Sequence, residues 1–228
     1  MTPQRPIVIA GPSANCGKTE LACQLIAALP GAQALKITRF HREEHCPVHG
    51  VNDQGQDNCD GCAPAPAGFE LIDDPAVLAT PNKDTDRLQR AGASKVLWLR
   101  AAPASFNYAL QKAVQRFDPQ KPLVVEGNSA ATVDDFDATV VVIWPQKTRG
   151  LKASVLPALK RCDVLVLVEA EGAPARPLPH TLRSACHRIG MDENRLPQVL
   201  WVKANWWQQP KDAQSSLIAL CTDVGTRK

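Results

Sequence analysis

One stretch near the start of the chain has the residue types of a phosphate-binding loop: Gly11-Pro12-Ser13-Ala14-Asn15-Cys16-Gly17-Lys18-Thr19. It follows an apolar run at 7–10 and precedes a helical pattern at 20–29. In such a loop, backbone N–H groups surround phosphate oxygens, the lysine neutralises them and the hydroxyl holds Mg²⁺. We therefore assign Lys18 to charge stabilisation in catalysis and Thr19 to Mg²⁺. The residues expected to bind the nucleotide here are Gly11, Ser13, Asn15, Cys16, Gly17, Lys18, Thr19 and Glu20.

The spacing of this loop departs from the usual pattern, because five residues rather than four separate its two glycines. The alternative is a Gly-Lys-Thr sequence in an ordinary turn. A predicted strand before the loop and a predicted helix after it are the context of a nucleotide site, and they favour the phosphate-binding interpretation.

A second set of chemistry-bearing residues lies at 41–68, where no apolar periodicity is found. Cys46 and His49 form one pair, and Cys59 and Cys62 form another. A two-residue gap lets both side chains of a pair bind one ion, and two pairs complete a tetrahedron. Thiolates with an imidazole favour Zn²⁺, and an iron–sulfur cluster is chemically allowed. The alternatives are a loop without metal and a redox pair formed by Cys59 and Cys62.

The remaining chain alternates apolar runs with helical patterns, which predicts an α/β fold. The runs are apolar throughout, as in parallel strands that are buried on both faces. We expect one three-layer P-loop NTPase domain over 1–228, with a mainly parallel sheet, the insert at 41–68 and ligands at the carboxyl ends of the strands. The predicted strands are 7–10, 34–38, 95–99, 123–126, 139–144, 164–168 and 199–202, and the predicted helices are 20–29, 84–91, 104–117, 150–160, 178–189 and 212–221.

Length and charge narrow the class of protein. A chain of 228 residues suits one α/β domain, and a net charge of +3 with dispersed Lys and Arg predicts no nucleic-acid partner. The first apolar run is far shorter than the ~20 residues that span a bilayer, and no export signal precedes it. We therefore expect a cytoplasmic protein without a membrane partner, in which the eight cysteines are thiols or metal ligands.

Three motifs in order resemble the P-loop protein B of molybdopterin-guanine dinucleotide biosynthesis. They are the phosphate loop, the run Lys83-Asp84-Thr85-Asp86-Arg87 with Ala91-Gly92-Ala93, and Val125-Glu126-Gly127. The resemblance covers roughly residues 5–130 and implies a GTP-binding accessory protein with Asp84 as a Mg²⁺ ligand. As an alternative, Asp84 caps the following helix. The insert and residues 131–228 are additions to that family's pattern.

A second resemblance accounts for the longer half of the chain. The glycine spacing, the Val-Glu-Gly strand end and a late strand running into Asn205 are similar to dethiobiotin synthetase and the cobyrinic acid a,c-diamide synthases. This resemblance implies that Glu126 positions Mg²⁺ or water in catalysis, Asn205 contacts the base, and Lys36 faces the γ-phosphate or substrate. Independently, a carboxylate that ends an apolar run needs a cation or donors to be buried, although a structural role for Glu126 is the alternative.

Two functions follow from these observations. In the first, an accessory protein binds and hydrolyses a nucleotide, GTP rather than ATP, in molybdopterin-type cofactor biosynthesis or metallocentre assembly. Its expected cofactors are GTP or ATP, Mg²⁺ and Zn²⁺ or an iron–sulfur cluster, and its expected partners are a metalloenzyme or biosynthetic client and a second copy in a homodimer. In the second, an ATP-dependent synthetase or kinase activates a small carboxylate, and the metal at Cys46 to Cys62 is purely structural.

Overall fold

The architecture is built on an eight-stranded sheet with the order β3-β4-β2-β5-β1-β6-β7-β8. It is seen in a computed structural model that describes residues 5–39, 68–148, 150–169, 178–192, 196–203 and Ala219. Neighbouring strands are parallel except for the antiparallel pair of β3 and β4 at one edge. The strands are β1 (Ile7–Ala10), β2 (Gln33–Arg39), β3 (Phe69–Ile72), β4 (Lys95–Ala101), β5 (Leu123–Glu126), β6 (Thr139–Pro145), β7 (Val164–Val168) and β8 (Gln198–Val202).

The central strands are apolar because both faces of the sheet are covered. Every residue of β1 and β5 is buried, and β6 is buried from Thr139 to Trp144. Val8 packs in the core on one face and its neighbour Ile9 in the core on the other, as the two-residue period of a strand requires. Continuous runs of Val, Ile and Leu in these segments are thus what a doubly covered parallel sheet needs.

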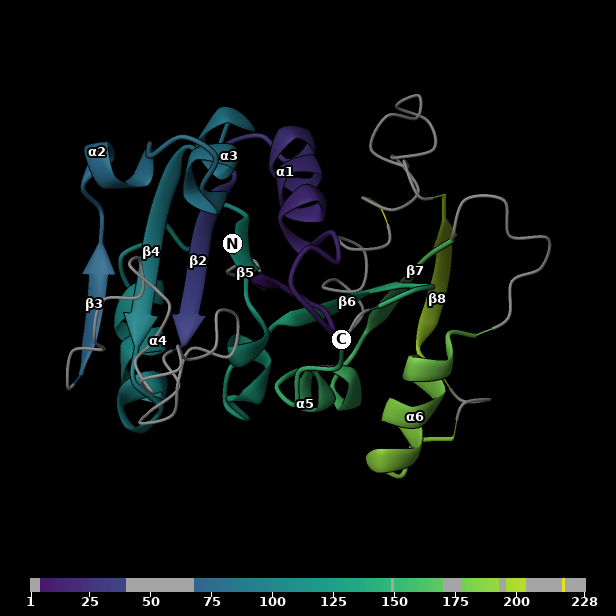
Figure 1. Ribbon diagram of the computed structural model, residues 1–228. Helices are drawn as coiled ribbons and strands as arrows, with labels where there is room; N and C mark the ends of the chain where they lie inside the picture. Colours follow the sequence, from purple (N-terminus) through teal and green to yellow (C-terminus); the bar gives the residue numbers. More distant parts are fainter. Residues whose placement is uncertain are drawn as a thin grey trace, which may run out of the picture.

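Helices form a layer on each side of this sheet (Figure 1). On one face pack α1 (Lys18–Ala28), α2 (Pro75–Leu78) and α3 (Asp84–Arg90), through residues such as Leu21 and Leu88. On the other face pack α4 (Phe106–Val114), α5 (Val155–Lys160) and α6 (His180–Arg188), together with the 3₁₀ helix η2 (Asn128–Thr132). The predicted three-layer α/β arrangement with a mainly parallel sheet is confirmed.

Several element boundaries differ from the predictions. The helix predicted over 104–117 begins as the 3₁₀ helix η1 (Pro103–Ser105) and continues as α4 only to Val114. The helix predicted over 150–160 begins at Val155. Neither β3 nor α2 was predicted, since β3 is an edge strand of four half-buried residues and carries no buried run. Among the described helices, none has the length and apolar character needed to cross a membrane.

Two predicted features lie outside the described residues. Apart from Gly68, the insert at 41–68 is among them, and so are its proposed ligands Cys46, His49, Cys59 and Cys62. The same holds for Asn205 and, apart from Ala219, for the helix predicted over 212–221.

Candidate functional site

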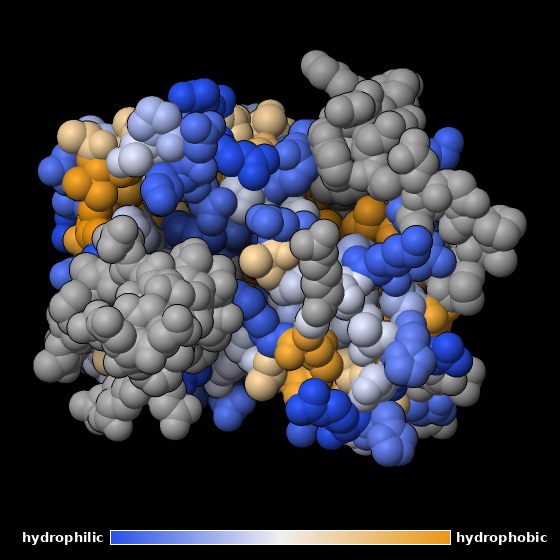
Figure 2. All heavy atoms as spheres, in the orientation of Figure 1, coloured by the Kyte–Doolittle hydropathy of each residue, from blue (hydrophilic) through white to orange (hydrophobic). Residues whose placement is uncertain are grey.

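A cleft of about 580 Å³ lies where β1, β2 and β5 end. Figure 2 shows hydrophilic side chains gathered around a hollow on this face of the molecule, below α1 and α3. This is the edge of a parallel sheet at which α/β proteins bind their ligands. The charged residues that line it are Lys18, Glu20, Lys36, Arg39, Asp84, Arg87, Glu126 and Lys152.

The phosphate loop joins β1 to α1 and forms one wall of the cleft. Gly17 is the N-cap of α1 and has a φ of 101°, a left-handed conformation that glycine adopts without strain. As a glycine, this N-cap residue has no side chain that could cap the helix. The N–H groups of its first turn are therefore available to an anion in the cleft, at the positive end of the helix dipole.

Gly11 is required by the packing under the loop. A Cβ at this position would lie 2.4 Å from Cys16 Sγ and 3.0 Å from the Ile143 carbonyl oxygen. Buried Asn128 holds the same residue from the other side, accepting from Gly11 N–H at 2.9 Å and donating to the Gly11 carbonyl at 3.0 Å. The start of the loop is thus fixed by a side chain that is distant in sequence.

The predicted nucleotide-binding residues fall into two groups. Asn15, Gly17, Lys18, Thr19 and Glu20 line the cleft, whereas Gly11, Ser13 and Cys16 are not among its lining residues and take part in contacts that hold the loop. The Lys18 ammonium donates to the Ser13 carbonyl at 2.7 Å and lies 3.4 Å from Cys16 Sγ. Lys18 therefore folds back over the loop in this structure, beside the space that a phosphate would enter.

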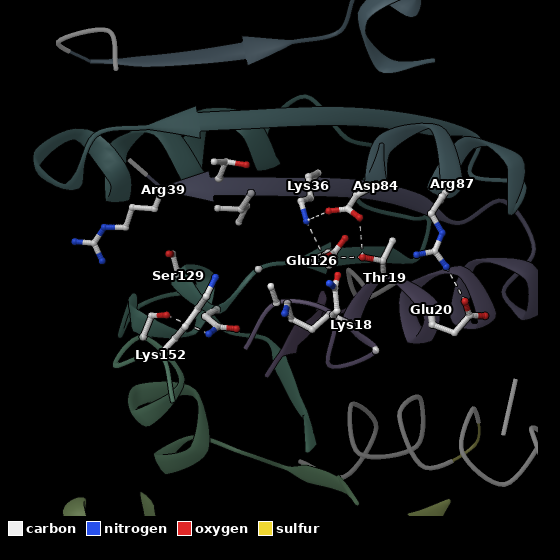
Figure 3. Close-up of a pocket in the computed structure, with 18 residues that line it drawn as sticks. Lys18, Thr19, Glu20, Lys36, Arg39, Asp84, Arg87, Glu126, Ser129 and Lys152 are labelled. Atoms are coloured by element: carbon white, nitrogen blue, oxygen red, sulfur yellow. Dashed lines mark hydrogen bonds and ion pairs between the residues drawn. The ribbon is translucent and has the colours of Figure 1, made fainter. Parts of the chain in front are cut away.

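Four side chains meet in the middle of the cleft (Figure 3). Thr19 Oγ1 lies 3.0 Å from Asp84 Oδ1 and 3.0 Å from Glu126 Oε1, so its hydroxyl donates to one carboxylate at a time. The Lys36 ammonium bridges the same two groups, at 2.5 Å from Asp84 Oδ2 and 2.8 Å from Glu126 Oε1. Lys36 and Glu126 meet because they are direct partners in the register of the parallel strands β2 and β5.

This cluster favours the charged forms of Lys36 and Asp84. Burial alone would lower the pKa of Lys36, but the carboxylates of Glu126 and Asp84 outweigh burial and raise it. For Asp84, burial acts to raise the pKa, and the charge and hydrogen bond of Lys36, with the hydroxyl of Thr19, lower it overall. The Asp84 carboxylate is thus held ready for a cation.

The cluster also fits Mg²⁺. Mg²⁺ prefers oxygen ligands and is usually held by one or two carboxylates together with substrate phosphates. Thr19, Asp84 and Glu126 offer a hydroxyl and two carboxylates in one place. Glu126 is 1% exposed, and its Oε2 atom is buried without a hydrogen-bond partner among the described residues. A buried carboxylate oxygen without a donor is costly, and a metal ion or a bound water would satisfy it.

The structure decides one alternative from the sequence. Asp84 is the first residue of α3, and the N-cap is Lys83, whose side chain makes no capping hydrogen bond. The interpretation of Asp84 as a helix cap is therefore wrong, because Lys36 and Thr19 draw its carboxylate toward the cleft.

Several lining residues were not found from the sequence. Arg87 pairs with Glu20 at 2.6 Å at one end of the cleft, and Arg39, Ser129 and Lys152 lie at the other end (Figure 3). For Arg39, Ser129 and Lys152 the signal was position alone, since each ends or follows a strand that ends at this edge of the sheet, whereas Arg87 lies within α3. Within the described part of the chain, no group of three or more His, Cys, Asp or Glu residues is placed to hold a metal.

Known proteins offer no match to this chain in sequence and a distant one in structure. No protein-family model matches the chain, and no curated protein matches its sequence. Among solved structures, HypB from Helicobacter pylori in complex with nickel aligns over 98% of this chain and 88% of its own, with 8% sequence identity and a TM-score of 0.47. A similarity this distant indicates neither a ligand nor a function for this chain.

Proposed function

We propose that this protein binds a nucleoside triphosphate with Mg²⁺ in the cleft and hydrolyses its terminal phosphate. The observation that carries the proposal is the meeting of Lys18 and Thr19 with Asp84 and Glu126 at the carboxyl edge of the sheet. A phosphate loop with two carboxylates beside its threonine supports binding of a metal–nucleotide complex better than binding of a free anion.

Each residue has a defined part in this reaction. Lys18 exchanges the Ser13 carbonyl for phosphate oxygens, and the open N–H groups at the start of α1 bind the same phosphates. Thr19 and Asp84 would hold Mg²⁺, which when bound neutralises charge on the phosphate oxygens. Glu126, buried next to them, orients the attacking water or adds a ligand to the ion, and Lys36 holds both carboxylates in place before the substrate arrives.

The proposal extends to the role in the cell. We infer an accessory protein for metal-cofactor biosynthesis or metallocentre assembly that uses GTP in preference to ATP. In support, Arg39 lines the cleft, and the segment with Cys46, His49, Cys59 and Cys62 begins soon after it in the chain. The end of β2 would then couple the nucleotide bound in the cleft to the metal bound by this segment.

A second candidate is an ATP-dependent synthetase or kinase that activates a small carboxylate, with a purely structural metal. The observation that favours it is the basic end of the cleft, where Arg39 and Lys152 would suit an anionic acceptor. In both candidate functions Asn205 is expected to contact the base of the nucleotide, and this contact remains a prediction.

The test is release of inorganic phosphate from GTP and from ATP by purified protein, with and without bound metal. The accessory function predicts release without any added small molecule, at a rate that changes on metal loading, and a loss of about a hundredfold or more in Glu126→Gln. Absence of release from both nucleotides would contradict it. A Cys59→Ser, Cys62→Ser variant should lose its metal by elemental analysis and keep nucleotide binding, and full metal content in that variant would exclude the proposed ligands.

A further inference from the structure

The cations that line the cleft divide into two kinds. At one end and in the middle, Arg87 pairs with Glu20, and Lys36 pairs with Asp84 and Glu126. The other cations, Lys18, Arg39 and Lys152, have no carboxylate partner among the described residues. Lys18 belongs to the phosphate loop, so Arg39 and Lys152, at the end of the cleft away from Arg87, are the two other lining cations without a carboxylate partner in the described part of the chain (Figure 3).

Arg39 contacts another part of the molecule through its side chain, and Lys152 does so through its backbone. The Arg39 guanidinium lies 5.8 Å from the ring centroid of Phe106, and Phe106 is buried at the start of α4. Lys152 is fixed through its backbone, because its N–H donates to the Pro12 carbonyl of the phosphate loop at 2.7 Å. The ring contact restricts the Arg39 guanidinium, and the backbone bond fixes the position from which the Lys152 side chain extends.

Charge repulsion marks Lys152 as part of a site. Burial of its ammonium and, next, the nearby positive charge of Lys18 lower the pKa of Lys152. Two ammonium groups facing one cavity without a carboxylate between them repel each other until an anion enters. Buried Ser129 lies between the two cations in Figure 3 and also lines the cleft.

We propose that Arg39, Ser129 and Lys152 bind an oxyanion of a second small molecule, a phosphate or carboxylate group, beside the terminal phosphate of the nucleotide. The inference rests on the proposed function for the position of that nucleotide. Guanidinium and ammonium groups form charge-assisted hydrogen bonds to such oxyanions, and the hydroxyl adds a neutral donor. The second ligand lies on the side of Lys18 opposite to the Thr19, Asp84 and Glu126 cluster.

The test is a calorimetric titration of inorganic phosphate into protein that is saturated with Mg²⁺ and a non-hydrolysable triphosphate, so that the phosphate loop is filled. Arg39→Gln and Lys152→Gln should each weaken phosphate binding by about tenfold or more. Lys152→Arg should retain it, and Lys112→Gln, at an exposed position on α4 outside the cleft, should leave it unchanged. Thermal unfolding of each variant reports whether it folds.

Titration with succinate separates the two sources of the oxyanion. Tighter binding of succinate than of phosphate identifies a carboxylate ligand, and the reverse order identifies a phosphate ligand. No binding of either probe to nucleotide-saturated protein, or equal binding in folded Arg39→Gln and Lys152→Gln, overturns the inference. If no nucleotide binds at all, the proposed function fails, and the same titration on Lys18→Ala protein still tests the second site.

Discussion

Replacing Lys36 with methionine removes the charge that balances two carboxylates while keeping a side chain of similar length. Glu126 is 1% exposed and would retain only the Thr19 hydroxyl, whereas the Asp84 side chain is 41% exposed and is partly compensated by water. Breaking a buried ion pair from one side costs about 3–5 kcal/mol, and the exposed partner adds less than about 1 kcal/mol. The cost should therefore come almost entirely from Glu126.

The assay is thermal unfolding followed by circular dichroism in EDTA. For a protein of this size, about 2–4 °C per kcal/mol predicts a fall in melting temperature of about 6–20 °C for Lys36→Met. A Lys36→Met, Glu126→Gln double variant should recover most of this fall, because the buried charge is gone. In a parallel series without EDTA, millimolar Mg²⁺ should partly rescue the single variant by entering the vacated position between the carboxylates.

The matched control is Lys112→Met on the exposed face of α4, which should melt like the wild type. If Lys36→Met melts at the wild-type temperature, Glu126 does not depend on Lys36 for its charge balance. A double variant as unstable as the single one would also contradict the reasoning, since the loss would then come from packing.

Three further predictions concern the loop and its neighbours. Gly11→Ala should weaken nucleotide binding and destabilise the fold by about 1–3 kcal/mol in denaturant titrations, because the new Cβ would lie 2.4 Å from Cys16 Sγ. The Ile143 carbonyl oxygen, at 3.0 Å, is a second obstacle to this Cβ. Full recovery of stability in a Gly11→Ala, Cys16→Ala double variant would argue against that second obstacle. Asn128→Ala should lose about 1–3 kcal/mol by the same measurement, whereas exposed Asn107→Ala should lose almost nothing. The pKa of Asp84 is lowered from its ordinary value of 3.8, so its carboxylate should stabilise the fold at every pH above 3.8 and lose this effect only as the pH falls below that value. Acid titration of the wild type and Asp84→Asn measures the difference in their free energies of unfolding. A difference that already vanishes near neutral pH would contradict this prediction.

The sequence was informative wherever a short segment carries its own signal. The phosphate loop, the apolar strands and Glu126 were all predicted from local residue types, because loop chemistry and two-sided burial leave a local pattern. The edge strand β3 was missed since its four residues are only half-buried and follow a segment without periodicity. Helix ends were placed several residues too far out, as at α4, where Pro103 opens a 3₁₀ turn first.

The supporting residues of the site were beyond the sequence because their contacts are long-range. Asn128 holds Gly11 from 117 positions away, and Lys36 and Glu126 are 90 positions apart. Their proximity comes from the register of parallel strands, which a single sequence does not reveal. Lys152 reaches the loop only because β6 lies next to β1 in the sheet.

Nucleotide binding at the phosphate loop is tested most directly by titrating fluorescent GTP and ATP analogues into the protein with and without Mg²⁺. Wild-type protein should bind at least one of them more tightly with Mg²⁺, and Lys18→Ala should weaken that binding by about tenfold to a hundredfold, with Lys112→Ala unchanged. Equal affinity in Lys18→Ala and wild type, or no binding of either nucleotide, would contradict the central claim.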